Sequence, residues 1–378
     1  MLMLRSFVIL LIAVAFAWSQ GSPLNFSGNG ARAAAMGNAF TGVADDATAI
    51  SWNPAGLTQL YSPEASIIGR FNFNSADISG YQDLGIGIES WDIESESNFK
   101  INFASIVFPF TVGKFNIVGG VAYRNQYDLA SEVTQTISDG FNEYEIYDVV
   151  DGGVNAISPS LGIQFNEMFS AGVAVNILTG TEEGEGYDDY FGGEYDYAYD
   201  YSGVSFDIGL LFRPSSMIAI GANLNLPHDI TEEMDGAKFK LDVPFFYSIG
   251  TGIRATDNLL LAFDYQSRAW SNSKIFKDLG VDLDLNSIHF GLEYLIQNGN
   301  AIFPIRAGFY TNPLLQMDDN GDQIVTNVIT VGTGIVMGTF IVDAAFEIES
   351  AEYDYGQGLV YDETNMRLTL GGTIHFGK

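Results

Sequence analysis

Apolar and polar side chains alternate along most of this chain, in segments of 9 to 13 residues from about Pro63 to Phe376. Successive side chains of a β-strand point to opposite faces, so each segment predicts a strand with one apolar and one polar face. In the last segment one face carries Met366, Leu368, Leu370, Ile374 and Phe376, and the other carries Arg367, Thr369, Thr373 and His375. This pattern limits the chain to an all-β fold.

The lengths of the connections between segments distinguish between two possible all-β folds, a sandwich and a barrel. A soluble β-sandwich also alternates, but it has no reason to keep its long connections at one end. Here tight turns and long stretches follow each other in turn, as in outer-membrane barrels with short periplasmic turns and long outer loops. The predicted strands are 63–75, 98–110, 114–127, 154–166, 168–179, 202–213, 215–226, 241–255, 257–270, 284–296, 301–312, 325–337, 339–350 and 366–376. The sequence therefore predicts a transmembrane antiparallel β-barrel of about 14 strands, with residues 182–200 outside the cell and Asn298-Gly299 in the periplasm.

The N-terminus has the pattern of a secretory signal. Arg5 precedes an apolar run from Phe7 to Phe16, and small residues follow, so residues 1–20 are predicted to be a signal peptide cleaved between Ala17 and Gly21. About ten apolar residues are too few to span a bilayer as a helix. The chain has no cysteine, so neither a lipid-anchoring cysteine nor a disulfide framework is expected.

Composition narrows the range of partners. The chain has 47% hydrophobic residues, 17% charged residues and a net charge of −31. Nucleic acid is therefore not an expected partner, because phosphate binding needs clustered Lys and Arg. Much of the acid lies in residues 182–200, together with several tyrosines. This stretch is interpreted as a solvated, self-repelling outer loop, and a calcium-ordered loop or a protein-docking surface remain alternatives.

A second acidic stretch has the ligand spacing of a calcium loop. Asp318, Asn320 and Asp322 stand at positions one, three and five, but Gln323 replaces the turn glycine and no Glu lies at position twelve. Structural calcium is therefore only a candidate here, and no other cofactor is expected.

Residues 21–62 do not alternate like the strands. They contain an Ala-rich, helix-capable stretch and the sequence Asn53-Pro54-Ala55-Gly56, in which Pro54 pushes Asn53 into an extended conformation. Their apolar content favours burial, because a free tail would expose it. We expect these residues to fold inside the barrel.

This region resembles the N-terminal hatch of the FadL/TodX family of outer-membrane transporters for long-chain fatty acids and hydrocarbons. The resemblance rests on Gly30-Ala31-Arg32-Ala33, Met36-Gly37-Asn38-Ala39-Phe40, Ala44-Asp45-Asp46-Ala47 and Trp52-Asn53-Pro54-Ala55-Gly56-Leu57. It implies a hatch at residues 21–62 inside the lumen of a barrel at 63–378, with gating residues at Gly37, Asp45, Asp46, Asn53, Pro54, Ala55 and Gly56. The same pattern is similar to PorV-like barrels of the type IX secretion system, which carry protein cargo.

The function implied by the resemblance is passive uptake of a hydrophobic small molecule through the outer membrane, past its lipopolysaccharide. The alternative is a PorV-like scaffold that binds a secreted protein through acidic outer loops. The predicted lumen charges are Arg124, Arg254, Arg268, Arg306, Asp264 and Glu293; the arginines would pair either with Asp45 and Asp46 or with carboxylates of the barrel wall. An enzyme is not expected, because the three histidines are not accompanied by a nucleophile motif.

Overall fold

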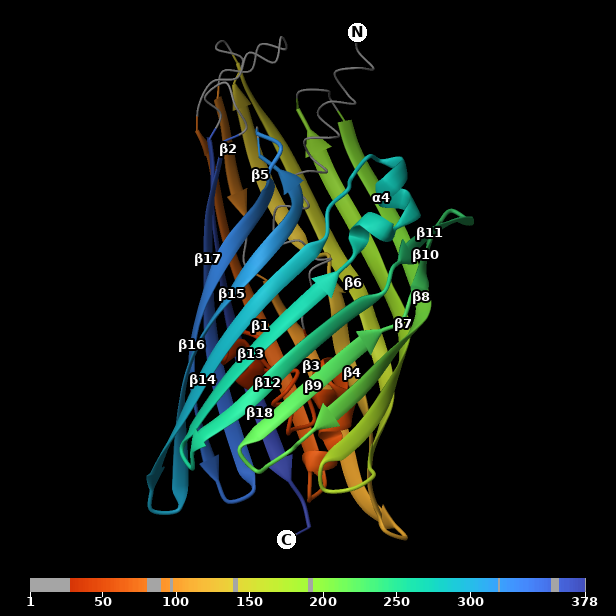
Figure 1. The fold of residues 1–378 in the computed structure, drawn as a ribbon. Helices are drawn as coiled ribbons and strands as arrows, with labels where there is room; N and C mark the ends of the chain where they lie inside the picture. Colours follow the sequence, from red (N-terminus) through yellow and green to blue (C-terminus); the bar gives the residue numbers. More distant parts are fainter. Residues whose placement is uncertain are drawn as a thin grey trace.

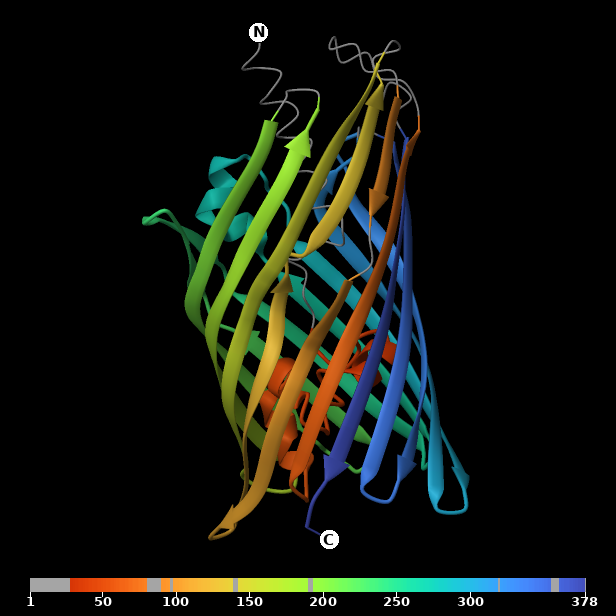
Figure 2. The same cartoon turned by 180° about the vertical axis from the view of Figure 1, so that it is seen from behind.

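The computed structural model describes residues 28–79, 90–95, 98–138, 142–189, 193–318, 320–354 and 360–377. The predicted signal peptide lies outside the described residues. The described part forms one antiparallel β-barrel whose wall surrounds a short helical segment (Figure 1). Figure 2 shows the same wall from behind, where β1 lies beside β3 and β18.

The strands of the wall are long and antiparallel. They are β1 (Glu64–Ser79), β2 (Ser90–Ser95), β3 (Asn98–Val112), β4 (Phe115–Asp128), β5 (Ser131–Ser138), β6 (Glu143–Gln164), β7 (Phe169–Asp188), β8 (Gly193–Phe212), β9 (Ile218–Asn225), β10 (His228–Met234), β11 (Ala237–Val243), β12 (Phe246–Thr256), β13 (Leu259–Arg268), β14 (Leu285–Asn298), β15 (Ala301–Met317), β16 (Gln323–Met337), β17 (Phe340–Asp354) and β18 (Val360–His375).

Fourteen strand pairings close the barrel, from β1–β3 around to β17–β18 and β18–β1. Four of the strands that cross the wall are each interrupted and consist of two consecutive pieces: β2 and β3, β4 and β5, β9 and β10, and β11 and β12. The eighteen described strands therefore form fourteen crossing segments. The predicted all-β barrel of 14 strands is confirmed.

The two ends of the barrel differ. Tight turns centred on Gly113, Gly299 and Gly338 lie at one end, and each of these glycines has a positive φ that suits a two-residue turn. We call this the short-turn end; the C-terminus lies there too (Figure 1). At the opposite end, called the extended end, β7 and β8 continue to Asp188 and Gly193.

The extended end corrects one sequence interpretation. Most of residues 182–200 are paired strand rather than loop, with Glu182 opposite Tyr199 and Gly186 opposite Tyr195. The reason is visible in β8 itself, where tyrosine recurs at every second position from Tyr195 to Tyr201. This is the period of a strand, and the high acid content concealed it.

The outward face of the wall is apolar. On β13, Phe263 is 47% exposed, whereas the next residue, Asp264, is 5% exposed and faces the lumen. The predicted alternation on β14 is also observed, with Ile288 exposed and His289 buried. A closed barrel with an apolar outward face satisfies every backbone group inside a membrane. Among the described residues, no helix combines the length and apolarity of a membrane span.

Residues 28–62, called the N-terminal segment, lie inside the barrel in its short-turn half (Figures 1 and 2). The segment contains α2 (Ala31–Ala35), α3 (Ala49–Trp52) and the 3₁₀-helix η2 (Pro54–Gln59). Most of its apolar side chains are buried, and Phe40, Ile50 and Leu57 are fully buried. At the extended end, η3 (Trp270–Asn272) and α4 (Lys274–Asp278) connect β13 to β14 beside β10 and β11.

Candidate functional site in the barrel lumen

Glycines of the wall bring the N-terminal segment into backbone contact with the strands. A Cβ built on Gly308 of β15 would lie 2.1 Å from the backbone nitrogen of Gly37. A Cβ on Gly172 would lie 2.3 Å from the carbonyl carbon of Pro54. Larger side chains at these positions would push the segment away, because no real Cβ tolerates such distances. Sequence reasoning missed these contacts, although the glycines stand on the polar faces of predicted strands.

Asn53 fixes the corner between α3 and η2. Its backbone is extended, with φ −164° and ψ 97°, which confirms the conformation predicted from the following proline. The side chain accepts a hydrogen bond from the Ala55 N–H at 3.2 Å. It donates to the carbonyl oxygens of Thr41 at 2.9 Å and Leu210 at 3.0 Å. One side chain therefore ties together two parts of the segment and strand β8.

Arg32 is the centre of an ionic network that sequence reasoning missed. Its guanidinium pairs with Asp45 and lies 3.9 Å from Asp46. It also donates to Glu293 of β14 at 2.9 Å. Of the two predicted pairings for the wall arginines, the one with wall carboxylates is found for Arg306, whereas Asp45 and Asp46 face an arginine of the segment itself. Glu293 in turn accepts from Arg306 at 2.7 Å, so the network joins the segment to the wall.

The other predicted lumen charges lie apart. Arg124 is buried and lies 3.3 Å from Asp207. Arg268 is buried higher in the lumen and donates to Gln266 at 2.9 Å. Arg254 lies at the short-turn end, where it is exposed and lines a cavity together with Gly42 and Val43 of the segment; β12 has a bulge at this position.

Asp264 and His289 hold the stretch Gly37–Thr41. The Asp264 carboxylate accepts the backbone N–H groups of Phe40 at 2.9 Å and Thr41 at 2.7 Å. His289 lies opposite Asp264 in the β13–β14 register and contacts the Gly37 carbonyl oxygen through Nδ1 at 2.9 Å. Asp264 is thus an anchor for backbone amides rather than a partner for an arginine.

Above the N-terminal segment, the lumen holds an apolar cluster, which we call the lumen cluster. Phe246 and Trp270 meet edge to face with ring centroids 5.1 Å apart, and Trp270 and Phe276 do so at 5.3 Å. The cluster comprises Tyr127, Val154, Ala156, Leu178, Ile230, Val243, Phe246, Trp270, Phe276, Leu285 and Leu315. Alternation alone predicts polar residues on this inner face. The tryptophan and phenylalanine just after β13 were the available signal.

A small cavity of about 70 Å³ lies between this cluster and the segment. Ser51 and Trp52 of the segment line it on one side, and Phe246 belongs to both the cavity and the cluster. The remaining lining is mainly polar: Arg124, Gln126, Tyr127, Asp207, Asn223, Asn225, Tyr247, Ser248, Gln266, Ser267 and Arg268. The lumen thus places a polar cavity directly beside an aromatic cluster.

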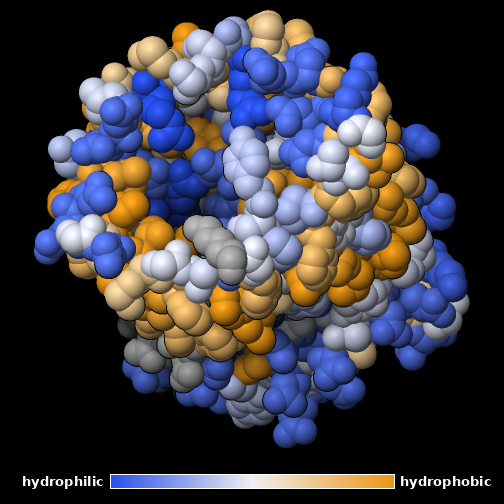
Figure 3. All heavy atoms as spheres, turned by 90° about the horizontal axis from the view of Figure 1, so that it is seen from below, coloured by the Kyte–Doolittle hydropathy of each residue, from blue (hydrophilic) through white to orange (hydrophobic). Residues whose placement is uncertain are grey.

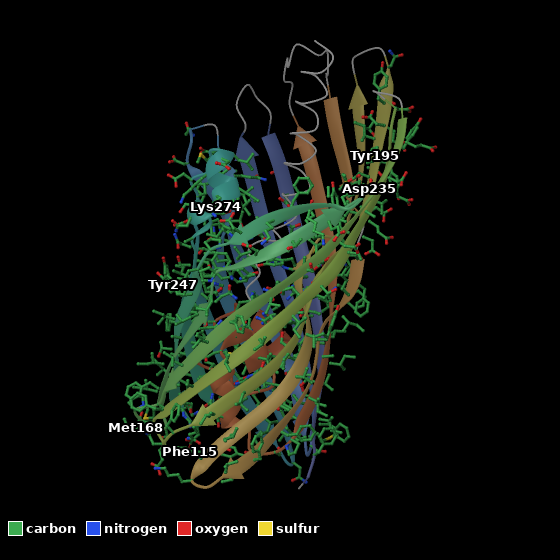
Figure 4. All side chains as sticks on the ribbon, turned by 90° about the vertical axis from the view of Figure 1, so that its right-hand side faces the viewer. Phe115, Met168, Tyr195, Asp235, Tyr247 and Lys274 are labelled. Carbon is green, nitrogen blue, oxygen red and sulfur yellow. The ribbon has the colours of Figure 1, made fainter. Side chains whose placement is uncertain are left out.

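Four tyrosines of β8 line the inner face of the wall towards the extended end. They are Tyr195, Tyr197, Tyr199 and Tyr201, here called the tyrosine ladder, and Figure 4 shows Tyr195 far from Met168 at the short-turn end. Tyr201 packs against the lumen cluster and donates to Glu182 at 2.7 Å. The Tyr195 hydroxyl donates to the Asp148 carboxylate at 2.8 Å.

A second cavity, of about 600 Å³, opens at the short-turn end. Gly42 and Val43 of the segment line it together with Gly252 of β12. Seen from this end, the surface is hollowed and hydrophilic residues line the hollow (Figure 3). The N-terminal segment therefore lies between two cavities.

The architecture is shared with solved transport proteins of very different sequence. The Ralstonia pickettii toluene transporter TbuX aligns with a TM-score of 0.62 and 16% identity, covering 94% of this chain and 100% of that chain. The Pseudomonas putida toluene transporter TodX aligns with a TM-score of 0.64 and 10% identity, covering 94% and 100%. A Pseudomonas aeruginosa FadL homologue aligns with a TM-score of 0.62 and 13% identity, covering 93% of this chain and 99% of that chain. This chain has the TodX fold.

At these identities the likeness establishes the fold. No protein-family model and no curated protein matches the sequence. A closed barrel of the TodX fold with an apolar outward face is a protein of the bacterial outer membrane. TbuX and TodX are transporters rather than enzymes.

The calcium candidate is a self-closed turn at the extended end of this TodX-like barrel. The Asp318 carboxylate accepts the backbone N–H groups of Asn320 at 2.9 Å and Asp322 at 2.8 Å. Hydrogen bonds from Asp322 and Asn320 lower the pKa of Asp318. Within the described ranges, no three His, Asp or Glu side chains converge where they could hold a metal ion.

Proposed function

We propose that this protein is a passive outer-membrane channel for the uptake of hydrophobic small molecules such as long-chain fatty acids or hydrocarbons. The observation that carries the proposal is the lumen cluster, because a polar or ion-conducting pore has no need of inward aromatic side chains. The similar structures include two toluene transporters and a monoaromatic hydrocarbon channel, which supports the same class of solute.

In this proposal the N-terminal segment is the hatch. A solute in the lumen cluster lies on the extended side of Ser51 and Trp52, and the cavity at the short-turn end lies on the other side. Outer-membrane barrels place their short turns in the periplasm, so the segment closes the periplasmic side. Solute release then requires a shift of the segment or a gap in the wall.

The shortest axial route follows the inner face of β12. Ser248 lines the upper cavity and Gly252 the lower one, and the two are only ~13 Å apart along a strand. Between them, Gly42 covers Gly250, and a Cβ built on Gly42 would lie 2.8 Å from the Gly250 backbone. Residues 41–43 are therefore the thin part of the hatch along this strand, and Thr41 is held by the Asp264 carboxylate, the Ser248 hydroxyl and the Asn53 side chain.

The wall offers a lateral alternative. The hydrogen-bonded ladder between β3 and β4 ends at Phe103 and Arg124. Further along the same two courses of the wall, the ladder resumes between β2 and β5. Lys100 and Asp128, 2.8 Å apart, bridge the interrupted ladder. The crosslinking experiment described in the Discussion separates the two exits.

Replacing Asn53 and Pro54 with alanine is expected to change uptake of a fluorescent long-chain fatty acid by at least twofold. The variant loses the Asn53 bonds to Thr41 and Leu210, and it loses the φ restriction of proline. Heat-modifiable migration on a gel should stay normal, because the strands close their own hydrogen bonds. Cells carrying Asn298→Ala, at a turn remote from the hatch, serve as the control. Uptake equal to wild type in the Asn53/Pro54 variant would argue against a hatch role for this corner.

The acidic outer strands favour a second candidate, a barrel that docks a protein. Glu183, Glu185 and Asp196 are exposed on β7 and β8 at the extended end. Co-purification of a large secreted protein, together with uptake no greater than in a deletion strain, would favour this function over transport.

A further inference from the structure

Four buried polar atoms around the upper cavity have no hydrogen-bond partner within the protein. They are Arg124 Nε, Gln126 Oε1, Asn223 Oδ1 and Gln266 Nε2. Arg124 is 2% exposed and Gln266 is 3% exposed, so bulk water does not replace the missing partners. Unpaired buried polar groups are costly, and a ligand that pairs with them gains affinity that a pure hydrocarbon does not.

The unpaired set mixes donors with acceptors. Arg124 Nε and Gln266 Nε2 donate, whereas Gln126 Oε1 and Asn223 Oδ1 accept. A hydroxyl group both donates and accepts, a carboxylate only accepts, and a methyl group does neither. The charge of Arg124 already faces Asp207, which also accepts from Asn225 at 2.8 Å. The second cation of the lining, Arg268, donates to Gln266.

The neighbouring lumen cluster favours a ring. Trp270 receives Phe246 and Phe276 edge to face, with both ring pairs inclined by 64°. Another aromatic ring can extend this packing, and edge-to-face contacts add to the energy of simple burial. Phe246 lines the cavity as well, so a ring against it places a substituent among the unpaired polar atoms.

The tyrosine ladder leads to the same place. Tyr201 packs on the lumen cluster, and Tyr197 and Tyr199 follow towards the extended end with ring centroids 5.3 Å apart. Glu182 and Asp148, which accept the hydroxyls of Tyr201 and Tyr195, put negative charge along this wall. Such a path suits a neutral aromatic solute better than an anionic one.

Resting on the proposed function, we propose that the preferred solute is a neutral aromatic compound with a hydroxyl group, of the phenol class. Its ring packs on Phe246 at the edge of the lumen cluster, and its hydroxyl accepts from Arg124 Nε and Gln266 Nε2 and donates to one of the two facing amide oxygens. This assigns a substrate class distinct from both fatty acids and unsubstituted hydrocarbons.

Four matched probes test the assignment on the purified full-length protein in detergent. They are p-cresol; toluene, which lacks the hydroxyl; 4-methylbenzoate, which carries an anionic carboxylate in its place; and 4-methylcyclohexanol, which keeps the hydroxyl on a saturated ring. Affinities are measured by calorimetry. We expect p-cresol to bind at least tenfold more tightly than each of the other three. Gln266→Leu should lower the affinity for p-cresol towards that of toluene. The matched control Gln297→Leu, at an exposed position near the short-turn end, should leave all four affinities unchanged.

The outcomes separate this inference from the function on which it rests. Equal affinities for p-cresol and toluene would overturn the role of the hydroxyl, and strongest binding of 4-methylbenzoate would overturn the neutral head group. Equal affinity for 4-methylcyclohexanol would overturn the aromatic preference. In each of those cases the channel function stands. Absence of binding for all four probes overturns the inference, and the function itself fails only if uptake of fatty acids and hydrocarbons also equals that of a deletion strain.

Discussion

Oxidising a Val43→Cys, Gly252→Cys double variant is expected to lower solute uptake at least tenfold, and reduction is expected to restore it. A Cβ built on Gly252 lies 2.9 Å from Val43 Cγ2, so a sulfur near that position is within reach of a disulfide. The natural chain has no cysteine, so no other disulfide competes. The bond would hold residues 41–43 against β12 and keep the two cavities apart. Uptake by cells is measured before and after treatment with a reductant.

A second crosslink provides the matched control. Thr58 Cγ2 lies 3.1 Å from a Cβ built on Gly162, so a Thr58→Cys, Gly162→Cys pair tethers the same segment to β6. Uptake by this variant should not depend on its oxidation state, because residues 41–43 remain free to move. If the oxidised 43–252 variant carries solute as fast as the reduced one, solute does not leave past residues 41–43, and the interrupted β3–β4 pairing becomes the preferred exit.

Replacing Gly308 with leucine is expected to dislodge the N-terminal segment and open the barrel. The new Cβ would lie 2.1 Å from the Gly37 nitrogen, and both neighbours are backbone, so neither side can give way by rotating a side chain. The barrel should still insert, since its ladder does not depend on the segment. In planar bilayers, the conductance should rise from near zero to that of an open pore.

Gly372→Leu is the control for this substitution. A Cβ on Gly372 meets no atom within 4 Å, so the same increase in volume leaves the segment in place. Limited proteolysis adds a second readout, because Trp52 and Asn53, both buried in the wild type, should become accessible only in Gly308→Leu. Closed, protease-resistant barrels in both variants would contradict the tight contact at Gly37.

The barrel was predictable because its information is local. On β13 and β14 every second side chain is apolar and outward, and that period survives in the structure. Residues 182–200 resemble a loop in sequence because their high acid content masks the strand period of the tyrosines, although most of them are paired strand. The membrane sets the length of the apolar band on the strands. The strands themselves continue beyond this band as long as their backbones remain paired.

The residues of the lumen site are brought together by contacts between distant parts of the chain, and the alternation along each strand does not predict such contacts. The pairing of Arg32 with Asp45 arises from the folding back of a short segment, whose course cannot be inferred from residue spacing. The lumen cluster assembles Phe246, Trp270 and Leu315 from separate strands and a connection. The corner at Asn53 was predictable, because proline acts on its immediate neighbour.

The central claim is that hydrophobic solutes cross the outer membrane through this lumen. The most direct test is the initial uptake rate of a radiolabelled hydrophobic solute by deletion-strain cells that produce either the wild type or Trp270→Arg, at equal amounts of heat-modifiable barrel. Trp270 is fully buried at the centre of the lumen cluster, so a charge there should block solute without touching the outward face. The account predicts uptake well above the deletion strain for the wild type and near that strain's level for Trp270→Arg. Equal uptake by the wild type and the deletion strain, or by the two proteins, would contradict it.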